Sequence, residues 1–362
     1  MNLLIIIPYS INESGIIVFA KRLIQEFHQQ GIYPTIVKPK DDYILNSSKI
    51  ICFDHPENNL DWIEFHFQLF DTIFWMGFLH SDDHLLRQLE IIKKIKRTAK
   101  QFLLWERTGT NIDIEKFPTP YVEFINHVDK IMVMNTNQFS QLKLYCITSR
   151  LHIITPGIDT INEFTPLLTT QKKIIRKKIG WPVDSIIFSY VGRFTRRKRI
   201  DLILNAWFSY KNNRSDWLAF VGSGFMQHDS VEPLITKAMQ ESPHILKEPY
   251  TEERASFYQA SDVLLLAGEI EGEPSVLSEA MACGLVIIAS NISGHQSLVI
   301  DGDTGLLFPP GNLDELIIRM QMVNNNVELR EYLGTNARLK VMATRDISTI
   351  SKNIIKLFQE EK

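Results

Sequence analysis

The chain has 362 residues, of which 44% are hydrophobic and 22% are charged. This balance is typical of a globular protein and excludes a disordered, collagen-like or coiled-coil chain. The length favours two domains over a single core. Lys and Arg number 39 against 42 Asp and Glu, which gives a formal net charge of −3. Because a general nucleic-acid-binding protein is usually basic, we expect no nucleic-acid partner.

The three cysteines, Cys52, Cys146 and Cys283, lie far apart and form no Cys-x-x-Cys pair. This spacing supports neither a disulfide framework nor a zinc knuckle, and it fits a reducing compartment. No segment reaches the roughly 18 consecutive apolar residues of a membrane helix, and the start of the chain lacks the basic front of a secretory signal. We expect a soluble, cytoplasmic protein that is able to rest on the inner face of a membrane.

The first half of the sequence alternates short apolar runs with helical periodicity. An apolar run at 3–7 predicts a buried strand, and apolar residues at helical spacing over 16–30 predict a helix that ends at Gly31. Further strands are expected at 34–37, 50–53, 72–75, 102–105 and 130–134. Strands that alternate with helices predict a parallel sheet that is covered on both faces.

Residues 155–170 interrupt the pattern with proline and glycine and predict a linker. Beyond it, strands are expected at 185–191, 218–221, 263–266, 286–289 and 306–308, and helices at 201–211, 253–260, 275–282, 313–324 and 347–358. The predicted fold class is α/β, with Rossmann-like domains at 1–160 and 170–345 and a final helix within 346–362. A cleft between two such domains is the default ligand site.

A basic turn follows the strand expected at 185–191. A turn between a buried strand and a helix is where α/β sheets bind anions. Gly192 allows close approach of the backbone, Arg193 can grip phosphate oxygens in a fork, and Lys198 adds a mobile point charge. Five basic residues near a helix start repel one another unless an anion is present. A solvated basic loop is the alternative.

A second polar turn follows the strand expected at 263–266. Pro274 suits the first turn of a helix. The next three residues would then present free backbone N–H groups, which bind anions readily; they are Ser275, Val276 and Leu277.

Glu271 and Glu279 flank this helix start and are eight residues apart. One therefore lies in the turn and the other two helical turns later, on roughly the same side. Acidic residues also stabilise a helix start through its dipole, which is the alternative explanation. For Glu279 that explanation is weaker, because a carboxylate among apolar residues usually has a partner.

These turns resemble motifs of the family 4 retaining glycosyltransferases, also called glycosyl transferases group 1. The Gly-Arg-x4-Lys segment at 192–198 resembles the diphosphate-binding loop, and Glu271-x7-Glu279 resembles the Glu-x7-Glu signature. Further matches occur in the family's order at 221–224, Tyr258, Ala260, Asp262, Gly294 and 301–305, and weaker ones at Gly15 and 156–159. The resemblance covers about the whole second half of the chain.

The resemblance implies the GT-B architecture: two Rossmann-like domains face a cleft, and the last helix crosses back to the first domain. The first domain would take a glycan or lipid-linked glycan as acceptor, and the second would bind a nucleotide-diphosphate sugar as donor. Arg193 and Lys198 would hold the diphosphate, Glu271 would lie near the sugar, and Glu279 would bind the ribose hydroxyls. These implied residues are Glu271, Arg193 and Lys198 for catalysis, and Gly15, Gly192, Arg193, Lys198, Tyr250, Ser275, Val276, Leu277 and Glu279 for donor binding.

The expected reaction needs no metal, because no Asp-x-Asp motif stands at a strand end, and no cofactor beyond the donor. Positioned cations and helix N–H groups would stabilise the charge that grows on the leaving diphosphate. The resemblance implies retention of the anomeric configuration by a front-face route in which the leaving phosphate helps to deprotonate the acceptor. Glu271 is not expected to act as a nucleophile.

The sequence departs from the family at two places. Ser297 stands where an acidic residue is common, and no histidine follows the strand at 102–105, where many members carry one. Glu106, Arg107 or His80 could replace that histidine. Two alternatives therefore stay open: a sugar-nucleotide 2-epimerase and a non-catalytic nucleotide-sugar-binding subunit. A nicotinamide dehydrogenase is disfavoured, since no Gly-x-Gly-x-x-Gly follows the first strand.

Two basic stretches have simple structural explanations. Residues 87–100 predict a helix that packs one apolar face on the sheet and exposes a basic face. The alternative is contact with an anionic membrane surface, to which each Lys or Arg would contribute about 1 kcal/mol. Residues 172–178 predict a solvated helix start.

Overall fold

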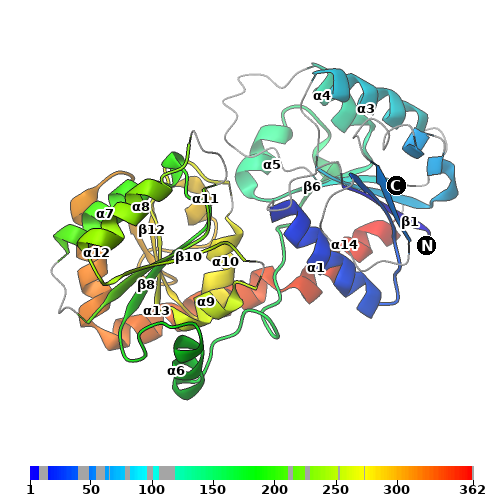
Figure 1. The fold of residues 1–362 in the computed structure, drawn as a ribbon. Helices are drawn as coiled ribbons and strands as arrows, with labels where there is room; N and C mark the ends of the chain where they lie inside the picture. Colours follow the sequence, from blue (N-terminus) through cyan, green and yellow to red (C-terminus); the bar gives the residue numbers. More distant parts are fainter. Residues whose placement is uncertain are drawn as a thin grey trace. The chain divides into compact units, whose positions relative to one another are not determined.

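The structure is a computed structural model of the chain, and the residues it describes are 1–7, 15–39, 49–53, 62–64, 66–77, 82–95, 101–105, 119–210, 215–224, 229–251, 253–272 and 274–360. The chain forms two compact units (Figure 1). Unit 1 comprises Met1–Gly157 and Ile347–Lys362, and unit 2 comprises Ile158–Asp346. Each unit is described below by itself.

Unit 1 is built on a seven-stranded sheet in the order β3-β2-β1-β4-β5-β6-β7. The strands, all paired in parallel, are β1 (Leu3–Ile6), β2 (Thr35–Pro39), β3 (Lys49–Phe53), β4 (Thr72–Met76), β5 (Gln101–Trp105), β6 (Lys130–Val133) and β7 (Leu151–Ile153). The helices are α1 (Gly15–Gln29), α3 (Asp82–Ile95), α4 (Thr119–His127), α5 (Thr136–Leu142) and α14 (Ile347–Gln359), with short 3-10 turns at Phe67–Leu69 and Thr148–Arg150.

The strands of unit 1 are apolar on both faces because helices cover both. Along β1, Leu3 and Ile5 pack in one buried cluster with α1 and α14, whereas Leu4 and Ile6 pack in a second cluster with α3 and α4. Figure 1 shows these two pairs of helices on opposite sides of the sheet. This period of two is why β1 appears in the sequence as a continuous apolar run.

Unit 2 is built on a six-stranded sheet in the order β10-β9-β8-β11-β12-β13. Its parallel strands are β8 (Ile187–Val191), β9 (Trp217–Val221), β10 (Ile245–Glu248), β11 (Val263–Leu266), β12 (Val286–Ser290) and β13 (Leu306–Phe308). The helices are α6 (Thr169–Lys178), α7 (Ile200–Ser209), α8 (Glu232–Glu241), α9 (Ala255–Ala260), α10 (Ser275–Ala282), α11 (Ser293–Gln296), α12 (Leu313–Asn325) and α13 (Val327–Arg345), and a 3-10 turn spans Arg196–Lys198. In Figure 1, α7, α8 and α12 lie on one side of this sheet, and α9, α10 and α13 lie on the other.

Both sheets follow the strand order of a Rossmann fold, which confirms the predicted α/β class. In unit 2 the chain runs outward from β8 through β9 to β10 and returns to β11 on the other side of β8. The order therefore reverses between β8 and β11. The turns that follow these two strands lie at this reversal, which is where open α/β sheets bind their ligands.

Every strand expected from the sequence is present, and two strands were missed. They are β7, which has three residues, and β10, whose sequence Ile-Leu-Lys-Glu is only half apolar. Both lie at the edges of their sheets, where a strand has a neighbour on one side only and needs fewer apolar residues. The 19-residue helix α13 was missed as well, because its charged residues obscure the apolar spacing.

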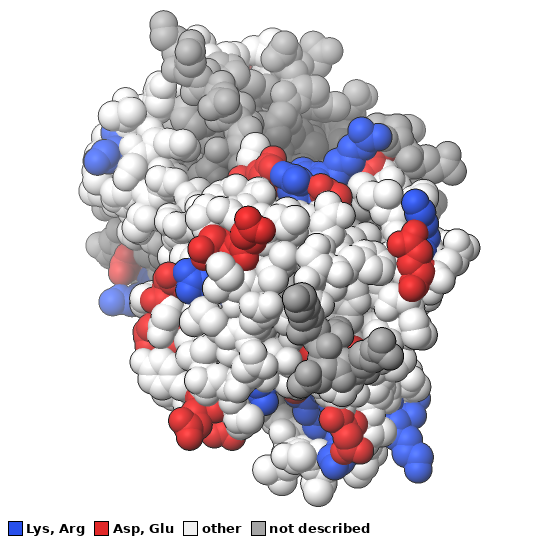
Figure 2. Space-filling model, turned by 90° about the vertical axis from the view of Figure 1, so that its left-hand side faces the viewer, with Lys and Arg blue, Asp and Glu red and all other residues white. Residues whose placement is uncertain are grey.

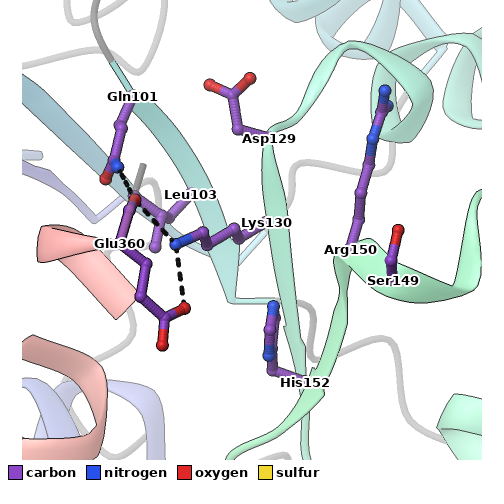
Figure 3. A pocket seen from close by; sticks show the side chains of 8 residues that line it. All are labelled: Gln101, Leu103, Asp129, Lys130, Ser149, Arg150, His152 and Glu360. Atoms are coloured by element: carbon purple, nitrogen blue, oxygen red, sulfur yellow. Dashed lines mark hydrogen bonds and ion pairs between the residues drawn. The ribbon is translucent and has the colours of Figure 1, made fainter. Parts of the chain in front are cut away.

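The C-terminal helix α14 is anchored in unit 1 at its last turn. The Lys130 ammonium at the start of β6 donates to the carbonyl oxygens of Leu357 at 2.7 Å and Glu360 at 3.1 Å, and Gln101 donates to the latter oxygen (Figure 3). A cavity of about 370 Å³ lies beside this anchor. Since Gln101 and Lys130 begin their strands, the cavity lies at the amino ends of the strands, opposite the edge at which α/β proteins usually bind ligands.

The basic face expected at 87–100 is largely neutralised in the described part of α3. Arg87 pairs with Glu64 at 2.6 Å and with Glu90 at 3.2 Å. Lys94 pairs with Glu64, and Lys93 lies 2.5 Å from Glu123. These ion pairs favour the packed helix over a membrane-binding face. Among the described residues, no helix has the length and hydropathy of a membrane span.

The solvated helix start expected at 172–178 is wrong for two of its residues. Lys172 and Arg176 turn inward and bind opposite oxygens of Asp262, at 2.5 and 2.6 Å. The same carboxylate accepts the backbone N–H of Ile187 at 2.8 Å. Burial alone would raise the pKa of Asp262, but the two cations outweigh it and the pKa lies below its ordinary value. This cluster ties α6 to β8 and β11.

Asp262→Asn should destabilise the protein by about 3 kcal/mol at neutral pH, because it leaves two largely buried cations without their counter-ion. A depressed folded-state pKa stabilises the protein above the pKa of the unfolded carboxyl, about 4, and the benefit is lost as the pH falls through the folded value. Urea unfolding at pH 7 and at a series of pH values below about 4 should therefore show a difference in unfolding free energy between wild type and variant that shrinks as the pH falls.

The matched control is Asp184→Asn, which removes a carboxylate that pairs with Lys173 of the same helix. Both partners are exposed, at 77% and 50%, so this substitution should leave the unfolding midpoint nearly unchanged. Equal effects of the two substitutions would contradict the structural role of Asp262.

Candidate functional site

The turn after β8 is built by close contact between two glycines. Gly192 and Gly222 have φ angles of +145° and +149°. A Cβ atom on Gly222 would lie 1.9 Å from the carbonyl oxygen of Gly192, so no side chain fits there. The Gly192 N–H donates to Val221 at 2.9 Å, and the Tyr190 hydroxyl donates to the carbonyl of Arg193 at 2.8 Å. The backbone of this turn is therefore fixed.

Lys198, in the 3-10 turn that follows, points inward and pairs with Glu271. Its ammonium donates to Oε1 of Glu271, and the two side chains are only 16% and 10% exposed. Burial lowers the pKa of Lys198, Glu271 opposes that shift, and Arg197 and Arg193 add to it by repulsion. The structure thus brings together two of the three predicted catalytic residues.

The third, Arg193, is exposed at the same turn. Among the described residues, no carboxylate pairs with its guanidinium or with those of Arg196 and Arg197, which are also exposed. Arg199 differs, because it pairs with Asp201 at 3.1 Å and with Glu269. Within the described part of the chain, the turn therefore presents three guanidinium groups without a carboxylate partner next to a largely buried ammonium. On the face shown in Figure 2, basic and acidic side chains lie in small mixed groups.

The loop that carries Glu271 is held by glycine contacts. A Cβ atom on Gly294, in α11, would lie 2.0 Å from the carbonyl oxygen of Gly272 and 2.4 Å from that of Glu271. A Cβ atom on Gly268 would lie 3.1 Å from Oε1 of Glu271. The backbone of Glu271 is therefore packed tightly against Gly294. A side chain larger than hydrogen at position 268 would crowd the Glu271 carboxylate.

Helix α10 begins at Ser275, directly after this loop. The Leu277 N–H donates to the carbonyl of Pro274 at 3.0 Å, so the expectation of a free amide is wrong for Leu277. No acceptor for the N–H groups of Ser275 and Val276 is found among the described residues, and both residues are half-buried. Two of the three predicted donors remain available to an anion.

Glu279 lies in a separate, fully buried cluster. Arg254 donates to both of its carboxylate oxygens, at 2.8 and 2.7 Å, and the Tyr258 hydroxyl donates at 3.0 Å. Burial opposes the charge of Arg254, but Glu279 raises the pKa of Arg254, and Tyr258 and Tyr250 contribute in the same direction. Because Glu279 has no exposed surface, a ribose could reach it only after this cluster shifts. Its role toward ribose stays a prediction.

Arg254 and His295 are the residues of this region that sequence reasoning missed. Arg254 precedes Tyr258 by four residues and so shares its helix face, which was the available signal. His295 is buried, and its Nδ1 lies 2.8 Å from the carbonyl oxygen of Ser290. Burial lowers the pKa of His295, which favours a neutral imidazole. Ser297, the departure from the family, caps the same turn by donating to Gly294 at 2.8 Å.

Several predicted residues cannot be related to this site. Glu106, Arg107 and His80 lie outside the described residues. Gly15 is the first residue of α1 in unit 1, and its contact with a donor stays a prediction. Tyr250 follows β10 and is half-buried near Arg254.

A family model described as Glycosyl transferases group 1 matches residues 171–340. This chain carries a domain of the glycosyl transferases group 1 family. The D-inositol 3-phosphate glycosyltransferase of Corynebacterium urealyticum is 30% identical over 167 residues, which are 44% of this chain and 39% of that protein. The capsular polysaccharide biosynthesis glycosyltransferase CapM of Staphylococcus aureus is 23% identical over 206 residues, 55% of this chain and 54% of that protein. The matches thus span only about two-fifths to one half of these relatives.

The group 1 domain and the rest of the chain share their fold with solved structures, which include WaaG, a glycosyltransferase involved in lipopolysaccharide biosynthesis (TM-score 0.74 over 99% of both chains, 15% identity). HepE of Anabaena, solved in complex with UDP, superposes with a TM-score of 0.80 over 99% of both chains, at 14% identity. The predicted resemblance and the GT-B type of fold are confirmed. At this identity the likeness concerns the fold alone.

Arg254→Met should destabilise the group 1 domain by about 3–5 kcal/mol, because it leaves the buried Glu279 carboxylate uncompensated. The double variant Arg254→Met, Glu279→Met should recover most of this loss, since apolar side chains of similar volume replace both charges. Urea unfolding of wild type, both single variants and the double variant measures the coupling. Additive losses would show that the two groups do not act as a pair.

Proposed function

We propose that this chain transfers a sugar from a nucleotide-diphosphate sugar to a hydroxyl group of an acceptor. The observation that carries the proposal is the largely buried Lys198 ammonium at the reversal of strand order in the group 1 domain. It is flanked by three guanidinium groups that pair with no carboxylate among the described residues. The two available N–H groups at the start of α10 follow the loop of Glu271. Family membership and the UDP bound by HepE support a nucleoside diphosphate as the anion.

The chemistry of such a site is electrostatic. As the bond between the sugar and the diphosphate breaks, negative charge grows on the leaving oxygen, and nearby cations and amide dipoles stabilise that charge more than the ground state. Lys198 and Arg193 would supply the cations, with Gly192 allowing close approach of the backbone. Tyr250 would border the base. Glu279 would reach the ribose only through a shift of its buried cluster.

We further propose that the reaction retains the anomeric configuration and uses no metal. The acceptor is proposed to be a glycan or a lipid-linked glycan, since CapM is named for capsular polysaccharide biosynthesis. A cytoplasmic location fits a nucleotide-sugar donor. Contact with a membrane through residues 87–100 stays a weaker prediction, because the described basic groups of α3 have acidic partners.

Lys198→Ala should weaken binding of the nucleoside diphosphate at least tenfold, because a charge-assisted hydrogen bond contributes about 1.5–3 kcal/mol. Isothermal titration with UDP, GDP and ADP measures this and also identifies the base. The matched control is Lys237→Ala, which removes an equal charge from the exposed end of a surface ion pair on α8 and should leave affinity unchanged. Equal affinity of wild type and Lys198→Ala would overturn the proposed site.

Incubation with nucleotide sugars and acceptor glycans should release nucleoside diphosphate at a rate that an excess of EDTA does not change. NMR spectroscopy of the product should show the anomeric configuration of the donor. Isomerisation of the sugar without an acceptor would instead identify a 2-epimerase. Nucleotide binding without turnover on any acceptor would identify a non-catalytic subunit.

A further inference from the structure

Lys198 forms an ion pair with Glu271. The carboxylate of Glu271 therefore competes for Lys198 with the anion that the turn is proposed to bind. Both groups are largely buried, so the pairing compensates two charges that would otherwise be costly. The three neighbouring guanidinium groups have no such partner among the described residues. Glu271 therefore neutralises Lys198, which is the least exposed cation of the turn.

The contacts around Glu271 show which part of it is able to move. Its backbone is clamped by Gly294, as the 2.4 Å approach of a Cβ atom to the Glu271 carbonyl oxygen indicates. Its side chain, in contrast, accepts only one hydrogen bond from the residues that the structure describes, and Lys198 donates it. A rotation about the side-chain torsions is enough to release the carboxylate while the loop stays in place.

We propose that Glu271 is an internal counter-ion that holds the place of the diphosphate, and that donor binding exchanges the partner of Lys198 from carboxylate to phosphate. This inference rests on the proposed function. The exchange keeps the ammonium paired throughout, whereas simple addition of the donor would leave two anionic groups competing for it.

The exchange has a consequence for selectivity. Once displaced, the carboxylate needs new hydrogen-bond donors, because a buried charge without a partner is costly. The hydroxyl groups of a donor sugar supply them, whereas a nucleoside diphosphate without sugar supplies none. Glu271 thus favours the sugar-bearing donor over the product, and its return to Lys198 helps to expel the nucleoside diphosphate after transfer.

The test is isothermal titration of UDP, GDP and ADP into wild type, Glu271→Gln and Glu269→Gln. If the ion pair is closed about nine-tenths of the time, Glu271→Gln should bind the free nucleoside diphosphate about tenfold more tightly. Glu269→Gln is the matched control, since it removes the same charge from the same loop but from Arg199 instead of Lys198. It should change the affinity by less than about twofold.

Unchanged or weaker binding by Glu271→Gln overturns the exchange, and so does equal tightening by both variants, which would indicate a general effect of charge. Binding of none of the nucleotides by any of the three proteins overturns the proposed function as well. If Glu271→Gln does not fold, Glu271→Asp replaces it: the shorter side chain keeps the charge but weakens the contact with Lys198. Its tightening should lie between those of wild type and Glu271→Gln, and no tightening would count against the exchange.

Discussion

An ammonium group withdrawn from water needs a negative partner, and the arrangement of the site in unit 2 depends on that requirement. Lys198 is only 16% exposed, and the charge that compensates it comes from Glu271, 73 residues further along the chain. Together with the ion pair between Arg199 and Glu269, this contact joins two turns that are distant in sequence. The exposed guanidinium groups around it raise the positive potential without adding a further fixed partner.

The fold makes this contact possible at little cost. Parallel strands β8 and β11 are neighbours, so the turns that follow them emerge at the same edge of the sheet. Glycines remove the side chains that would keep these turns apart: Gly192 meets the turn after β9 through Gly222, and Gly294 meets the loop of Glu271. The buried Asp262 and Glu279 clusters are separate from this contact. They hold α6 and α9 against the sheet. In this way they stabilise the sheet and helices from which the two turns extend.

Some features of the structure could be predicted because they correspond to a recognisable pattern in the sequence, and others could not because they have no such pattern. Strands such as β8 and β11 are buried on both faces and are recognisable as apolar runs, whereas the edge strands β7 and β10 are short or half polar and leave no such run. The basic turn and Glu271 were predicted from their position after buried strands. Their direct pairing was not, because spacing along a chain does not specify which cation a loop carboxylate meets.

The buried ion pairs were the least predictable features. Lys172 and Arg176 look like a solvated basic stretch until Asp262 is found between them. For Glu279 the sequence indicated that a partner exists, but it did not identify Arg254, which is near in sequence to Tyr258 and far from Glu279. In both cases the partner comes from another element, and its choice depends on packing.

The most direct measurement of the central claim is the distance between Lys198 Nζ and the nearest phosphate oxygen in a crystal structure of the chain with a bound nucleoside diphosphate sugar. The account predicts a hydrogen bond of roughly 2.7–2.9 Å, with the Glu271 carboxylate turned away from Lys198 and toward the sugar hydroxyl groups. A nucleotide bound elsewhere, with the pair between Lys198 and Glu271 intact, would contradict it.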